Sequence, residues 1–131
     1  MTQVIKPWWR NVPAPQFNQI LTFGGEIYYA PGKWGEKLHV GDNFTIEAIR
    51  RDIKFKLKPF VLTTVETNIN GEFILTLITL YFHVSLHKIF LQVTEKETLK
   101  RAVFDLGQLV NLQLTTQTQL IPPLVVHWGP N

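Results

Sequence analysis

The chain has no cysteine, a single methionine and no membrane-length hydrophobic run. The absence of cysteine excludes disulfide frameworks, thiol nucleophiles and metal sites with cysteine ligands. The most apolar stretch, residues 73–87, carries no Lys, Arg, Asp or Glu, but it is shorter than the about 20 residues that a membrane helix needs. Residues 1–10 lack the apolar stretch and cleavage site of a secretory signal. We therefore expect a cytoplasmic protein.

What is present fits one globular domain. The 131 residues are 45% hydrophobic and 18% charged, and a chain of this length can bury a core without covalent staples. Residues 1–19 are rich in Pro, Asn, Gln and Trp, which is typical of an extended arm. We predict that the ordered domain occupies residues 20–131.

Residues 20–93 have the pattern of a β-rich region. Short β-branched and aromatic segments alternate with Gly- and Asn-containing turns, and Asn70-Gly71 is the strongest hairpin signal. The β-branched and aromatic content of residues 73–84 favours a buried central strand over a helix.

A helix is expected after these strands. Thr94 and Glu97 have the spacing of a capping box, and apolar residues then recur at helical intervals up to Val110. We predict one amphipathic helix over residues 95–111. The expected fold class is α+β, with a curved, mainly antiparallel sheet and this helix packed on it.

The positive charge is confined to the N-terminal part. Residues 1–58 hold nine basic and five acidic side chains, and the remainder holds four and five. Most of the excess lies in one segment, where basic and apolar residues alternate as on a strand with one basic face: Arg50, Arg51, Lys54, Lys56 and Lys58. Three readings are open: a solvated edge strand, an anionic membrane or acidic protein surface, and a nucleic-acid site, which the lack of interleaved aromatics disfavours.

The arm carries a second candidate site. Trp8 and Trp9 lie beside Arg10, and indole rings next to basic residues favour the headgroup region of a membrane. The alternative is that these rings pack onto the domain.

No residue pattern indicates catalysis or a cofactor. His83 and His87 would share a helix face, but on a strand they lie about 13 Å apart, too far for one zinc ion. The carboxylates are scattered near expected turns, and no nucleotide-binding or nucleophile motif occurs. We expect no metal, no cofactor and no enzymatic activity.

The order of features resembles a known family. In residues 82–103 an apolar strand ends in an aromatic-polar-Val step, an aromatic-Leu-x-Val connection follows, and Thr-Leu-x-Arg-Ala comes after an acidic residue. Residues 25–34 and 50–64 are similar to the opening strand and the Arg-containing strand of the same family. The chain thus resembles the SPFH (band 7, prohibitin and stomatin-like) domain, most of all its HflK-type bacterial branch, over residues 25–111.

The resemblance implies a scaffold or adaptor module that works near membranes. Its partners would be other proteins, proteases or further copies of the chain among them, with peripheral contact to anionic membrane. Three family features are not visible, namely an N-terminal membrane helix, a long coiled coil and a second helix after the first. The alternative is a small β-rich domain that binds nucleic acid or another anionic ligand through residues 50–58 together with aromatic residues: Tyr28, Tyr29, Trp34 and Phe55.

Overall fold

A computed structural model describes residues 18–32, 36–51, 60–80, 88–110 and 118–130. These residues form the strands β1 (Asn18–Tyr29), β2 (Leu38–His39), β3 (Phe44–Arg50), β4 (Phe60–Glu66), β5 (Glu72–Leu80), β6 (Ile89–Glu95), β7 (Arg101–Asp105), β8 (Gln119–Leu120) and β9 (Leu124–Val126), and the helix α1 (Leu106–Leu109).

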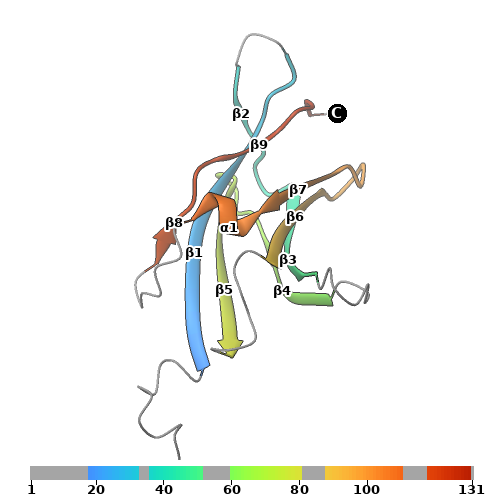
Figure 1. The fold of residues 1–131 in the computed structure, drawn as a ribbon. Coiled ribbons are helices and arrows are strands. Elements are labelled where there is room, and N and C mark those ends of the chain that lie inside the picture. The colour runs from blue at the N-terminus through green and yellow to red at the C-terminus, as the bar shows by residue number, and fades with distance from the viewer. Residues whose placement is uncertain (1–17, 33–35, 52–59, 81–87, 111–117, 131) are drawn as a thin grey trace, which may run out of the picture.

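The strands form two sheets (Figure 1). One has the order β4-β3-β6-β7 and is antiparallel throughout. The other is built on the long strand β1, which pairs antiparallel with β5 and β2 and parallel with β8 and β9. The α+β class with mainly antiparallel sheet and a single short helix is thus confirmed.

The two sheets share one hydrophobic core. Every second residue of β3 and β6 is buried, as expected for strands with one face on the core. The other side of the core is formed by β1 and β5. Their inward side chains are almost fully buried: Leu21, Phe23, Phe73, Leu75 and Leu77. Leu106 of α1 is also fully buried in this core, so the short helix packs against the sheets.

β1 continues through Gly24-Gly25 as one uninterrupted strand. A side chain at Gly25 would meet the ring of Phe73 at 2.6 Å, because Phe73 lies opposite Gly25 in the ladder and its ring covers the space beside the glycine. The two glycines therefore mark a close approach between β1 and its neighbours, not a hairpin turn.

The turn at Asn70-Gly71 forms, but it does not close a hairpin. Gly71 has a φ of +75°, and Asn68 N–H donates to the Glu72 carbonyl at 2.8 Å. The strands on either side pair with different partners, β4 with β3 and β5 with β1. The predicted hairpin is wrong, because the turn carries the chain from one sheet to the other.

The predicted helix over residues 95–111 is also wrong in its extent. Residues 101–105 form β7, and the helix covers only Leu106–Leu109. Glu95 N–H donates to the Lys100 carbonyl at 2.9 Å, and Leu99 adopts a positive φ of 62°, so residues 95–100 form a hairpin turn. Pairing with β6 gives β7 the hydrogen bonds that a helix would have supplied.

The buried central strand expected at residues 73–84 is only half correct. β5 is a strand with buried residues at alternate positions, but among the described residues it pairs with β1 alone and lies at the edge of its sheet. Its other face is exposed. Residues 81–84 lie outside the described chain.

Candidate functional site

The outer surface of β1, β5 and β8 is unusually apolar. Four aliphatic side chains share it, and we call them the apolar face: Ile20, Ile74, Ile78 and Leu120. They are exposed by 60%, 67%, 67% and 84%. Scattered apolar side chains on a surface need no explanation, whereas several on one sheet face mark a candidate interaction site.

Strand register brings these residues together. Ile20 lies directly opposite Ile78 across the β1–β5 ladder, and Gly24 lies opposite Ile74. Leu120 is the register partner of Gly24 on the other side of β1, and a Cβ on Gly24 would lie 3.3 Å from the Leu120 side chain. Leu120 therefore occupies the space beside Ile74 that Gly24 leaves open. Ile20 with Ile78 and Ile74 with Leu120 therefore form two apolar pairs on one surface, with Thr22 and Thr76 between them.

A hollow of about 620 Å³ continues the apolar face toward the turn at Asn70-Gly71. Its wall is largely apolar, with Phe73, Ile74, Leu120, Ile121 and Pro123. A hollow of this kind accepts an apolar side chain of a partner better than a charged one.

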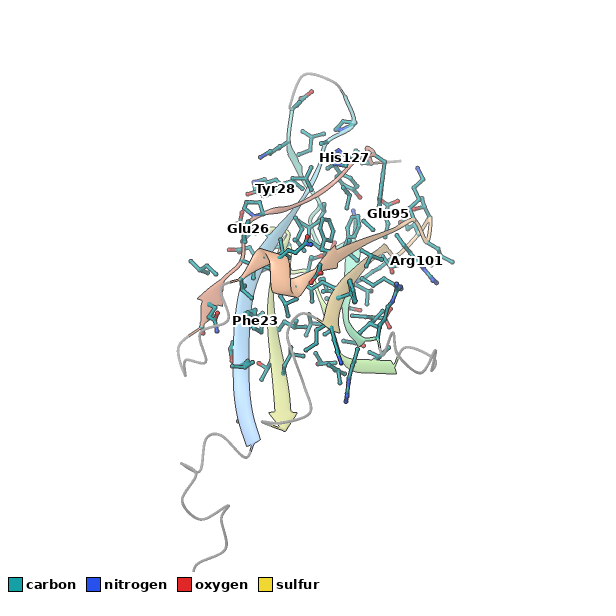
Figure 2. The ribbon with its side chains drawn as sticks, viewed as in Figure 1. Phe23, Glu26, Tyr28, Glu95, Arg101 and His127 are labelled. Carbon is teal, nitrogen blue, oxygen red and sulfur yellow. The ribbon has the colours of Figure 1, made fainter. Side chains whose placement is uncertain are left out.

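The carboxylates at the rim of the hollow already have partners. Tyr28 Oη donates to Glu26, the Asn68 side chain donates to Glu72 at 3.3 Å, and Lys96 Nζ lies 3.1 Å from Glu66. Figure 2 shows Glu26 and Tyr28 on the same part of β1, beyond Phe23. The hydrogen bond to Glu26 raises the pKa of Tyr28, so its hydroxyl stays protonated as a donor. The hollow thus combines an apolar wall with three carboxylates that are each held by a neighbouring side chain.

A second polar cluster surrounds Glu95, the last residue of β6. Its side chain is 4% exposed, which is rare for a carboxylate. It accepts hydrogen bonds from Tyr29 Oη at 2.6 Å, from Trp128 Nε1 at 3.3 Å and from the Thr98 hydroxyl. These donors come from β1, the C-terminal segment and the β6–β7 turn.

These contacts keep Glu95 ionised. Burial favours the neutral acid, but hydrogen bonds from Thr98, Tyr29 and Trp128 and the charge of Lys100 outweigh it, so the pKa of Glu95 is lowered. Burial and the hydrogen bond to Glu95 in turn raise the pKa of Tyr29 to about 12.

The surroundings of Glu95 indicate a structural role. The ring of Phe44 lies 5.6 Å from that of Tyr29 and 6.2 Å from that of Trp128, so the aromatic donors are packed into the core. The carboxylate accepts three hydrogen bonds, and the cluster joins three chain segments. We assign it to stability.

The predicted basic site is only partly described. Arg50 is the last residue of β3, and the exposed Arg51 follows it with its guanidinium 5.3 Å from the centre of the Phe90 ring. Lys54, Lys56 and Lys58 lie outside the described residues, as do Trp8, Trp9 and Arg10 of the arm. Arg51 N–H donates to the Lys88 carbonyl at 3.1 Å, so an exposed lysine that the sequence pattern did not include lies beside this end of β3.

The aromatic set of the nucleic-acid alternative does not come together as expected. Tyr29 is 2% exposed and its hydroxyl donates to Glu95, so it cannot stack on a base. Tyr28 is half-buried against His39, at 5.0 Å between ring centres. Trp34 and Phe55 lie outside the described residues.

Neither a metal cluster nor a membrane helix is found in the part of the chain that the structure describes. No three His, Asp or Glu side chains there gather as metal ligands would. No helix there has the length and hydropathy needed to cross a bilayer.

Comparisons with known proteins show little. No family model matches the chain, and no curated protein matches it. Among solved structures, a 9R-lipoxygenase from Cyanothece PCC8801 is similar at a TM-score of 0.45 and 16% sequence identity, over 98% of this chain and 19% of the lipoxygenase. The chain thus spans about a fifth of that enzyme's length, and a likeness of this size carries no argument about function.

Proposed function

We propose that this chain is a non-enzymatic assembly module that binds other protein chains through the apolar face. The observation that carries the proposal is the clustering of four exposed aliphatic side chains from three strands, next to a hollow with an apolar wall. Burying such a surface against a partner removes it from water, at about 25 cal/mol per Å² of apolar area.

The resemblance to SPFH domains supports the same class of function, because it implies a scaffold or adaptor. It supports only the general class, since the helix that it implies after residue 95 is replaced by β7 and the short α1. Membership of that family stays a prediction.

The proposal is tested with a double variant of the apolar face, Ile20→Ser with Leu120→Ser. Both side chains are exposed, so the fold should be retained, whereas partner binding should fall at least tenfold. Proteins retained from a cell extract by the wild type and lost with the variant are purified and titrated against both. Val61→Ser with Val103→Ser is the matched control, since these valines are exposed on β4 and β7. Equal binding by the wild type and the apolar-face variant would contradict the proposal.

A second candidate function is contact with an anionic membrane. The observation that favours it is the placement of exposed Arg51 and Lys88 side by side at one end of β3 and β6, where the basic segment of residues 50–58 begins. Each basic residue near an anionic surface contributes about 1 kcal/mol of binding.

Flotation with vesicles tests this second candidate. The protein should float with phosphatidylcholine vesicles that contain phosphatidylserine, less so as salt is raised, and not with phosphatidylcholine alone. Arg51→Glu with Lys88→Glu should reduce flotation severalfold, whereas the matched pair Lys37→Glu with Arg101→Glu, exposed residues away from this end of β3, should change it less. Failure of the wild type to float at low salt would rule the candidate out.

A further inference from the structure

β5 has an open edge, and the backbone groups on it can be identified. Ile27 N–H donates to the Gly71 carbonyl. This bond fixes the phase of the β1–β5 ladder, that is, which residues of β5 point their backbone groups toward β1. In an antiparallel pair, residues alternate between bonding the partner strand and pointing away from it. The residues of β5 that point away from β1 are therefore the exposed ones: Glu72, whose backbone groups bond Asn68, and Ile74, Thr76 and Ile78.

Two further bonds agree with this phase. The carbonyl of Gly24, opposite Ile74, accepts from Ile121 N–H on the side of β1 away from β5. Glu72 N–H donates to Asn68 Oδ1 at 3.0 Å rather than to β1. Within the described chain, no strand pairs with the outer edge of β5.

The sequence of this edge reads the same in both directions. Residues 74–78 are Ile-Leu-Thr-Leu-Ile, with Thr76 at the centre. A two-fold interface brings each residue against its symmetry-related counterpart, so a palindromic strand pairs with itself without mismatch. The palindrome selects Thr76 as the centre, and the backbone phase is compatible with it, since Thr76 is one of the residues that point away from β1.

We propose that a second copy of this chain pairs with β5 edge to edge, antiparallel, about a two-fold axis at Thr76. Thr76 then faces Thr76 of the second copy, and Ile74 faces Ile78. Each of these pairs exchanges two backbone hydrogen bonds. The sheets of the two copies become one, and an Ile74–Ile78 pair lies on each side of the central Thr76 pair.

Charge placement agrees with self-pairing. Residues 73–80 carry no charged side chain, and the pairing sets Glu72 opposite position 80 of the second copy, so the two Glu72 carboxylates lie at opposite ends of the shared ladder. Proteins normally protect open edges with charges, prolines or bulges.

The two edge strands of the other sheet have such protection. β7 carries Arg101 and Asp105, and the β3–β4 ladder has an irregularity at Ala48/Ile49. β5 is long, apolar and regular, which is the kind of edge that pairs with another chain.

This inference rests on the proposed function, because it names a second copy as one partner of the module, but it uses the edge of β5 and not Leu120. The experiment measures dimerisation by sedimentation equilibrium for the wild type, Thr76→Lys and Thr22→Lys. Thr22 is the matched control, since it lies opposite Thr76 on the same surface, and in the dimer the two copies of Thr22 are about 14 Å apart.

The wild type and Thr22→Lys should dimerise, and Thr76→Lys should dimerise at least tenfold more weakly because two ammonium groups meet at the axis. Mixing Thr76→Lys with Thr76→Glu should restore a heterodimer, which also shows that both variants are folded. A wild type that stays monomeric, or equal dimerisation of the two lysine variants, would overturn the inference.

The two proposals fail separately. Ile20→Ser with Leu120→Ser leaves the hydrogen-bonded edge intact, so this variant should still dimerise when its binding to other proteins is lost. A dimer whose apolar face binds no other protein would leave the inference standing and remove the proposed function.

Discussion

Replacing Glu95 by alanine is expected to lower the free energy of unfolding by about 3 kcal/mol, because buried donors lose a charged acceptor. The hydroxyls of Tyr29 and Thr98 and the indole N–H of Trp128 all donate to this carboxylate. Glu95→Gln keeps the shape but loses the charge, so about half of that effect is expected. Urea denaturation followed by tryptophan fluorescence measures both variants.

The control is Glu97→Gln, which removes an exposed carboxylate two residues away and should change stability by less than about 0.5 kcal/mol. Equal stability of Glu95→Ala and Glu97→Gln would show that the cluster does not stabilise the fold.

The same cluster predicts a pH dependence. The pKa of Glu95 is lowered on folding from its usual 4.5, so its contribution is fully present above that value and is lost as pH falls through the folded-state pKa. The difference in unfolding free energy between the wild type and Glu95→Gln should therefore shrink below about pH 4.5. A difference that stays constant down to low pH would contradict the lowered pKa.

Gly25→Ala is the second substitution with a large expected effect, a loss of about 2 kcal/mol in unfolding free energy. The new Cβ would lie 2.6 Å from the Phe73 ring and 2.9 Å from the Ile121 side chain. Both side chains are buried, so neither can move aside cheaply. Thermal and urea unfolding measure the change.

Gly24→Ala is the matched control for this substitution. Its Cβ would meet the exposed Leu120 side chain at 3.3 Å, which can turn away, so stability should change by less than about 0.5 kcal/mol. If both alanine variants unfolded alike, the close packing of Phe73 on β1 would be contradicted.

Strand positions were predictable because alternation and turn residues are local signals. The helix predicted over residues 95–111 was largely wrong. It was predicted because apolar residues there fit a helical period: Leu99, Ala102, Val103 and Leu106. Val103 is 46% exposed in β7, so pairing with β6 decided the outcome against the local pattern.

The apolar face could not be predicted from the sequence for a related reason. The apolar face depends on the register that sets Ile20 against Ile78 and on the parallel pairing that brings Leu120 to Gly24. No local signal specifies either of these long-range pairings. The role of Glu95 was hidden in the same way, since its partner Trp128 is more than thirty residues away.

Amide hydrogen exchange on β5, measured residue by residue at low and high protein concentration, tests the central claim most directly. The account predicts that the amides of Ile74, Thr76 and Ile78 exchange fast in dilute solution and become protected as concentration rises, while those of Leu75 and Leu77 are protected throughout. Fast exchange of the three outward amides at every concentration would contradict assembly through this edge.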